Sequence, residues 1–296
     1  MNFEEFTDSI VGLLKQKIED SCTITVKEVL KNNDVRMTGI VITKESDGIS
    51  PTIYLDGFYA QYQDIDSLEK VAEEIIGLYK SHIPYVKLDM EFFKDFSLVE
   101  GRIFHKVINH EMNLELLKDV PHFRWHDLAV VFYYSMDRVI SGAASILIHN
   151  CHLDMWKQTA EKIYLIAQRN MKQKMPERLI PMQKLMDELR EEGVETEETG
   201  LKLYVLTNRE KLYGASAMLY SEKMKGLADR LGSDLLILPC STHEVLLLPD
   251  DCDHDYEPYK KMVHAVNTTQ VDPEEILSFN LYRYDRDKAE IEQIAV

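Results

Sequence analysis

The stretch SDLLILPCSTHEVLLLPDD, residues 233–251, contains two apolar runs separated by a polar break. Both runs are rich in residues that favour strands, and turn-forming residues bound them. Pro239 ends the first run, where a residue without a backbone N–H disturbs a sheet ladder least. The stretch therefore predicts a β-hairpin whose loop is CSTH.

Other elements are predicted on both sides of this hairpin. Apolar residues at steps of three and four predict a helix over residues 3–18, and β-rich runs predict a strand pair at 23–30 and 35–43. The remaining predicted helices cover residues 66–82, 159–168, 181–193, 222–231, 259–266 and 273–277, and the remaining strands cover 128–135, 143–150, 201–207, 215–221 and 280–285. Hairpins interrupted by helices predict an α+β fold, in which mainly antiparallel sheets pack with helices.

Two segments share one order of features, namely a strand, a turn with Gly and Ala, a second strand and a helix. This order predicts two ββα-type units. The acidic run at 191–199, with five glutamates, predicts an exposed linker and a boundary near residue 195. We accordingly predict three regions: an N-terminal α/β region at 1–120, a first ββα unit with a helix at 121–195, and a ββα-hairpin-helix domain at 196–296.

The composition indicates a soluble globular chain. It is 45% hydrophobic and 29% charged, with a net charge of −17 that opposes binding to nucleic acids and to anionic membranes. Its apolar runs are strand-sized, far below the ~20 residues that cross a bilayer, and its first residues do not resemble a secretory signal. Four scattered cysteines favour the reducing cytoplasm. We expect a cytoplasmic protein.

The hairpin loop contains the residue types of a hydrolase site: Cys240, His243 and Glu244. A catalytic cysteine needs a base that lowers its pKa, and His243 lies three residues away. Catalytic Cys/His pairs usually come from separate parts of a chain, however. The interpretation that we favour is a buried cysteine beside a tight turn, with the hydrolase site as the alternative.

A second cluster, in HNCHLDMW, contains His149, Cys151 and His152, which are good zinc ligand types. A zinc site here would need distant ligands as well, for example Cys252 and His254. The alternative, which we favour, is a strand that runs into the start of a helix. The known phosphate-binding, dinucleotide-binding and metalloprotease motifs are missing from the sequence, so we expect neither a metal nor a cofactor.

Whole phrases of the C-terminal third carry a resemblance, namely YVLTNREKLYGASAMLYSEKMKGLADRLGSDLLILPCSTHEVLLLPDD and VNTTQVDPEEILSFNLYRYD, and it extends through DGFYAQYQDIDSLEKVAEEI. These phrases resemble a domain-of-unknown-function family of clostridial-type gut anaerobes, and the resemblance implies a gene near mobile genetic elements. The family implies no activity and no catalytic residue for this chain.

Three functions follow from the sequence. The first is a non-enzymatic binding or adaptor protein that acts on a protein partner through its sheet and hairpin loops. The second is a Cys/His or metal-assisted hydrolase. The third is an acidic mimic of nucleic acid that occupies a nucleic-acid-binding protein. The missing motifs and the unpaired candidate nucleophile favour the first function.

Overall fold

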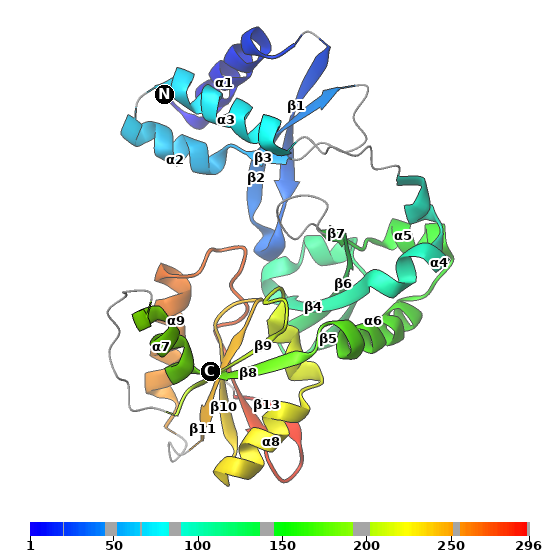
Figure 1. Cartoon of the computed structure of the whole chain (residues 1–296), viewed down its shortest axis with the longest axis vertical. Coiled ribbons are helices and arrows are strands. Elements are labelled where there is room, and N and C mark those ends of the chain that lie inside the picture. Colours follow the sequence, from blue (N-terminus) through cyan, green and yellow to red (C-terminus); the bar gives the residue numbers. More distant parts are fainter. Residues whose placement is uncertain are drawn as a thin grey trace. The chain divides into compact units, whose positions relative to one another are not determined.

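The computed structural model describes residues 1–19, 21–44, 52–65, 67–82, 90–136, 145–191, 202–250 and 255–294. Its contacts divide the chain into two compact units (Figure 1). Unit 1 comprises Met1–Lys31, Val35–Val99 and Ser135–Ser145, and unit 2 comprises Asn32–Asp34, Glu100–Tyr134 and Ile146–Val296. Most of the predicted linker, including the boundary near residue 195, lies outside the described residues.

Unit 1 contains a three-stranded antiparallel sheet in the order β1-β2-β3. Its elements are α1 (Phe3–Lys17), β1 (Cys22–Leu30), β2 (Arg36–Lys44), β3 (Thr52–Tyr54), α2 (Asp56–Ile65), α3 (Leu68–His82), η2 (Met90–Lys94) and α4 (Phe96–Val99). The apolar stripe of α1 supplies Phe6, Ile10 and Leu14 to a core that it shares with the sheet, α2 and α3. The predicted helix at 3–18 and the predicted strand pair are confirmed.

Unit 2 is built on two antiparallel sheets. The four-stranded sheet has the order β4-β6-β5, with β7 paired to β6: β4 (Ile103–Asn109), β5 (His122–Trp125), β6 (Leu128–Ser135) and β7 (Ser145–Leu147). The six-stranded sheet has the order β13-β12-β10-β11-β9-β8: β8 (Glu177–Pro181), β9 (Tyr204–Asn208), β10 (Leu235–Pro239), β11 (Val245–Pro249), β12 (Leu281–Asp285) and β13 (Glu290–Ile294). Antiparallel sheets packed with helices confirm the predicted α+β class.

The helices of unit 2 connect and cover these sheets. They are η1 (Asn32–Asp34), η3 (Glu100–Arg102), η4 (Glu111–Asn113), η5 (Leu116–Lys118), α5 (Asn150–Trp156), α6 (Ala160–Lys174), α7 (Met182–Glu191), η6 (Gly214–Leu219), α8 (Glu222–Leu231) and α9 (Glu257–Thr269). Thr159 and Ser221 cap the starts of α6 and α8 with their hydroxyl groups. Gly232 ends α8 in the left-handed conformation that favours glycine.

The hairpin quoted at the outset forms the centre of the six-stranded sheet. Strands β10 and β11 pair from Leu235↔Pro249 to Pro239↔Val245, which confirms the predicted hairpin. Alternate residues of β10 face opposite sides, so that Leu235 and Ile237 join one core with α8 while Leu236 and Leu238 join another with α9. Figure 1 shows the two helices on opposite sides of this sheet.

Two local predictions are wrong. The segment at 215–221, predicted as a strand, lies largely in the 3-10 helix η6. Gly214 brings its backbone against β9 and the hairpin loop, and both edges of β9 are already paired, with β8 and β11. The segment at 273–277, predicted as a helix, is a turn followed by a bridge between Ile276 and Ser241. The bridge fixes an extended backbone at Ile276, which is incompatible with a helix there.

Candidate functional site

Cys240 lies half-buried in the hairpin loop. Its Sγ donates a weak hydrogen bond to the carbonyl oxygen of Leu238 at 3.8 Å. Burial raises the pKa of the Cys240 thiol to about 12, and the charge of Glu244 contributes in the same direction. At neutral pH the thiol is therefore protonated, whereas a nucleophilic cysteine must be a thiolate.

His243 is bound to other parts of unit 2. Its Nδ1 accepts a hydrogen bond from the backbone N–H of Tyr213 at 3.2 Å, and its Nε2 lies 3.3 Å from Oε1 of Glu275. The imidazole also stacks on the Tyr213 ring at 5.4 Å between centroids. These contacts tie the hairpin loop to η6 and to the turn before β12, and they occupy both ring nitrogens.

The second predicted cluster lies where α5 begins. His149 precedes the helix, and its backbone N–H donates to Nδ1 of His152 at 3.0 Å. Its own Nδ1 lies 2.8 Å from Oδ2 of Asp119. Burial, followed by the charge of His149, lowers the pKa of His152, and Cys151 is exposed on the helix. The His152 imidazole thus binds the backbone at the start of α5, whereas the His149 imidazole pairs with Asp119.

The described residues contain no group of three or more His, Cys, Asp or Glu side chains arranged to hold a metal ion. Cys252 and His254, the distant ligands considered above, lie outside those residues. The catalytic and metal-ligand assignments both stay predictions.

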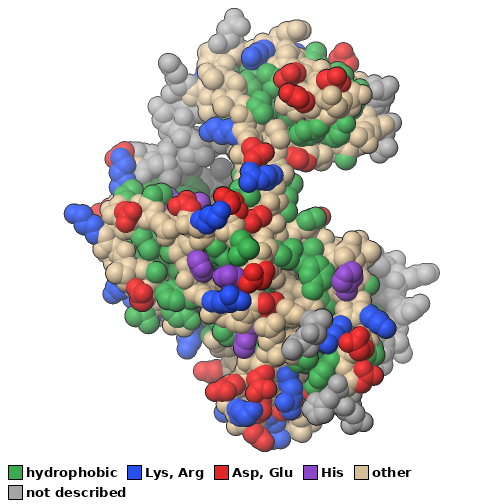
Figure 2. All heavy atoms as spheres, turned by 180° about the vertical axis from the view of Figure 1, so that it is seen from behind, with side chains coloured by type: hydrophobic (Ala, Val, Ile, Leu, Met, Phe, Trp, Pro, Cys, Tyr) green, Lys and Arg blue, Asp and Glu red, His purple; other side chains and the backbone are tan. Residues whose placement is uncertain are grey.

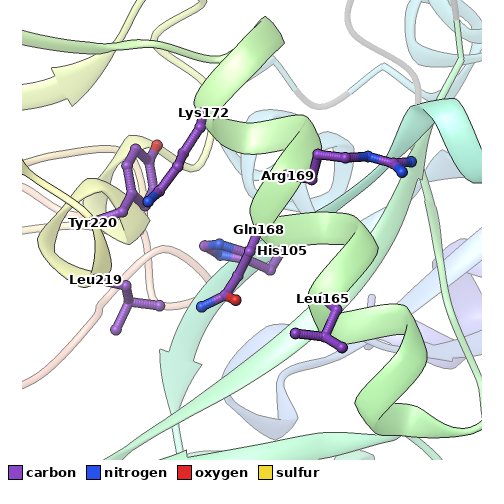
Figure 3. Close-up of a pocket in the computed structure, with 7 residues that line it drawn as sticks. All are labelled: His105, Leu165, Gln168, Arg169, Lys172, Leu219 and Tyr220. Atoms are coloured by element: carbon purple, nitrogen blue, oxygen red, sulfur yellow. The ribbon is translucent and has the colours of Figure 1, made fainter.

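A pocket that the sequence analysis did not anticipate lies in unit 2 between α6, strand β4 and the end of η6. Its volume is about 310 Å³, at the small end of the range for ligand sites. We call it the His105 pocket, and its walls are His105, Leu165, Gln168, Arg169, Lys172, Leu219 and Tyr220 (Figure 3). Helix α6 packs along β4, and η6 packs against both β4 and β9, which brings the three elements together.

His105 is the chemically distinctive wall of this pocket. Its side chain is 1% exposed, and its Nδ1 is buried with no hydrogen-bond partner among the described residues. Burial lowers the pKa of His105 to about 4, so the imidazole is neutral at physiological pH. Its ring lies near those of Tyr164 and Tyr220, at centroid distances of 6.3 and 5.9 Å. A neutral imidazole can both donate and accept a hydrogen bond.

Helix α6 contributes the polar rim. Gln168 and Lys172 are spaced by four residues and therefore lie on one face of the helix. Figure 3 shows both side chains extending toward the segment that carries Leu219 and Tyr220, whereas Arg169 extends to the other side of the helix. The hydroxyl group of Tyr220 donates to the carbonyl oxygen of Met175 at 3.3 Å, which holds this ring at the pocket wall.

A second pocket, of about 440 Å³, lies between α8 and strands β8 and β9. Its lining residues are Leu179, Pro181, Tyr204, Lys223, Gly226 and Arg230. Lys223 already donates from Nζ to the carbonyl oxygen of Glu177 at 3.0 Å, and none of the lining side chains has a buried atom without a partner. This pocket therefore lacks the unsatisfied polar group that distinguishes the His105 pocket.

The sequence contains only a weak signal for the His105 pocket. His105 is flanked by apolar residues in RIFHKVIN, which resembles any buried strand. The α6 face with Leu165, Gln168 and Lys172 resembles a solvated helix surface. Only the packing of α6 on β4 reveals that the two patterns meet.

The fold and the pocket together define an α+β protein with a small polar cavity between a helix and a sheet. No helix among the described residues is long and apolar enough to cross a membrane. The chain belongs to the Family of unknown function (DUF5688), which it matches over residues 3–286. Neither the curated proteins nor the solved structures contain a match to this chain.

Proposed function

We propose that this chain is a non-enzymatic binding protein and that the His105 pocket holds its ligand. The observation that supports this most directly is that His105 lines a cavity while its buried Nδ1 has no hydrogen-bond partner among the described residues. Leaving such a group unsatisfied costs about 1–3 kcal/mol, which a ligand in the cavity would recover. The proposal retains the binding role predicted from sequence, and the protein partner stays a prediction.

The hairpin loop gives less support to the hydrolase alternative. A hydrolytic cysteine needs an activating base, whereas His243 pairs with Glu275 and with the Tyr213 backbone. The raised pKa of the Cys240 thiol also opposes thiolate formation. In this proposal the loop acts as a connector within unit 2.

The face that Figure 2 shows gives no particular support to the acidic mimic. Among the described residues on the face in Figure 2, acidic and basic side chains are interspersed over the surface. A protein that imitates nucleic acid would instead present a continuous row of carboxylates. We therefore retain the binding protein as the preferred function.

The proposal can be tested with ligand-observed NMR on the full chain. Four probe classes would be screened: carboxylates, phosphates, amines and neutral amides. The matched proteins are the wild type, Gln168→Trp, whose indole would fill the cavity, and Lys162→Ala, which removes an exposed side chain of the same helix that does not line the cavity. We expect at least one class to bind the wild type and Lys162→Ala but not Gln168→Trp. The proposal fails when no class shows this dependence on an open cavity.

A further inference from the structure

The charge of the His105 pocket differs from that of the whole chain. The sequence has 51 acidic residues against 34 Lys and Arg, yet none of the residues lining the pocket is acidic. Lys172 and Arg169 form no hydrogen bond or ion pair with another described residue, whereas many lysines and arginines elsewhere do. A cation without a counter-ion beside an open cavity favours an anionic ligand.

The number of cationic side chains directed into the pocket determines the charge of the anion that the pocket favours. Figure 3 shows Lys172 directed toward the side of the pocket that holds Tyr220, while Arg169 extends the other way. A single ammonium balances a monoanion such as a carboxylate, whereas a phosphate with a charge near −2 would leave charge unpaired. The remaining polar walls are the Gln168 amide and the neutral His105 imidazole, both of which can donate hydrogen bonds.

The surroundings limit the charge that the pocket accepts. Burial, and to a smaller degree the charge of Glu177, raises the pKa of Tyr220. Glu177 begins β8 two residues after Met175, whose carbonyl oxygen accepts a hydrogen bond from the Tyr220 hydroxyl group, so a negative group lies near this wall. Oε1 of Glu177 accepts a hydrogen bond from the backbone N–H of Lys223 at 2.9 Å, which fixes its position. A second negative charge on the ligand would be repelled by this carboxylate.

The volume of the pocket and its apolar rim indicate what the rest of the ligand is like. A volume of about 310 Å³ corresponds to roughly ten water molecules at ~30 Å³ each, which suits a molecule the size of an amino acid. Leu165 at the rim is 62% exposed, and Leu219 and the Tyr220 ring provide further apolar surface. The ligand would thus combine one carboxylate with a small apolar body.

We propose that the His105 pocket binds the carboxylate of a small apolar acid or of a peptide chain end, with Lys172 as its counter-ion. This inference rests on the proposed function, because it names the ligand class of the same site. Gln168 and His105 donate hydrogen bonds to the carboxylate oxygens, and the buried imidazole thereby gains the partner that it lacks.

The test uses calorimetric titration of the full chain with defined probes. Phenylacetate represents a free acid, N-acetylphenylalanine represents a chain end, N-acetylphenylalanine amide is the uncharged match, and inorganic phosphate is the competing anion. We expect one or both carboxylates to bind at millimolar concentration or below, and the amide and phosphate to bind about tenfold more weakly. The carboxylate that binds more tightly shows whether the ligand is a free acid or the end of a peptide chain.

Matched variants assign the effect to the proposed counter-ion. Lys172→Gln should weaken carboxylate binding by about tenfold or more, since a charge-assisted hydrogen bond is lost. Lys162→Gln removes an equal charge from an exposed position of the same helix that does not line the pocket, and it should leave binding within about twofold of the wild type, because exposed charges are well screened. Phosphate binding more tightly than either carboxylate, or equal losses in both variants, would overturn the inference.

Failure of this inference is separable from failure of the proposed function. The carboxylate inference is overturned if neutral amides or amines bind the wild type but not Gln168→Trp while neither carboxylate binds. In that case the proposed binding function is retained. If no probe distinguishes the wild type from Gln168→Trp, both the carboxylate inference and the proposed function are overturned.

Discussion

Two fully buried tyrosines of unit 2 differ in whether their hydroxyl groups have a partner. Tyr133 is 1% exposed, and its hydroxyl group forms no hydrogen bond with another described residue. Tyr282 is 0% exposed and donates to the carboxylate of Asp127, which Ser278 and Asn280 also contact. Because a buried hydroxyl group without a partner is costly, these two residues should respond to the same substitution in opposite ways.

We expect Tyr133→Phe to raise the free energy of unfolding of unit 2 by about 1 kcal/mol, since an unsatisfied hydroxyl group is removed. Tyr282→Phe should lower it by about 2 kcal/mol, because the Asp127 carboxylate loses a charge-assisted bond. Urea unfolding followed by tryptophan fluorescence measures this, because both tryptophans, Trp125 and Trp156, belong to unit 2. A loss of stability in Tyr133→Phe would show that its hydroxyl group has a partner in solution.

Cys240 should be slow to alkylate. Burial raises the pKa of its thiol to about 12, whereas Cys151 is exposed on α5. At neutral pH we expect iodoacetamide to modify Cys151 long before Cys240, because only the thiolate reacts and access is limited. Peptide mass spectrometry over a time course separates the two sites. Equal rates for Cys240 and Cys151 would instead point to an activated thiol and revive the hydrolase alternative.

The lowered pKa of His105 predicts that the protein becomes less stable in acid. Burial lowers the pKa of His105 from 6.5 to about 4. Above pH 6.5 both the native and the unfolded chain hold a neutral imidazole. As the pH falls from 6.5 to about 4, the unfolded chain binds a proton at this imidazole and the native chain does not, so the free energy of unfolding decreases. The total loss from this group is about 3 kcal/mol, and it is complete below about pH 4.

Urea unfolding between pH 7 and pH 4 tests this slope, with tryptophan fluorescence reporting on unit 2. His105→Gln should flatten the profile, whereas His264→Gln, at an exposed position of α9, should leave it unchanged. A profile that His105→Gln does not alter would mean that the native protein protonates this imidazole readily.

At the scale of elements, the position of η6 depends on one glycine. A Cβ atom at Gly214 would lie 2.2 Å from Oγ1 of Thr207, 2.6 Å from the carbonyl oxygen of His243 and 2.7 Å from the backbone nitrogen of Asn208. Two of these neighbours are backbone atoms, which cannot move without shifting β9 and the hairpin loop. Glycine is therefore required by close packing at this position.

We expect Gly214→Ala to destabilise unit 2 by about 1–3 kcal/mol, as overpacking does in other cores. Gly226→Ala is the matched control, because a Cβ atom there meets nothing within 4 Å and the residue lies inside α8. It should stabilise unit 2 by up to about 1 kcal/mol through helix propensity. Thermal unfolding monitored by tryptophan fluorescence distinguishes the two signs, and a stable Gly214→Ala protein would mean that η6 can shift away from β9.

The elements differ in how well the sequence predicts them. The hairpin of β10 and β11 and the helices α1 and α8 are predictable, because apolar periodicity and capping residues are local signals. Strand β13, with the sequence EIEQI, is missed because a short polar edge strand has little apolar content. Helix η6 is mistaken for a strand because GASAML has small residues that fit either conformation.

The candidate site is less predictable than the fold for a physical reason. The pair Cys240 and His243 lies close in sequence, yet folding turns the imidazole toward Tyr213 and Glu275. His105 and Lys172 are distant in sequence and meet only because α6 packs on β4. Burial makes His105 neutral and leaves its Nδ1 without a partner among the described residues. It arises from tertiary packing and has no signature in the sequence.

At the scale of the whole molecule, the net charge of −17 governs long-range encounters. Phosphate backbones bind proteins mainly through clustered lysines and arginines, whereas in this chain many lysines and arginines pair with nearby carboxylates, as in Arg283 with Asp234 and Lys288 with Glu292. Lys172 therefore acts at short range, at the wall of a cavity of about 310 Å³.

This charge distribution predicts the response to nucleic acid. We expect a fluorescently labelled DNA duplex to show no change in anisotropy with the full chain at any salt concentration, because the net repulsion outweighs isolated cations. A cationic peptide such as polylysine is the control, since it should bind at low salt and dissociate as salt screens the attraction. DNA binding that weakens with increasing salt would reveal a cluster of cations strong enough to overcome the net charge, and would require a function that includes nucleic acid.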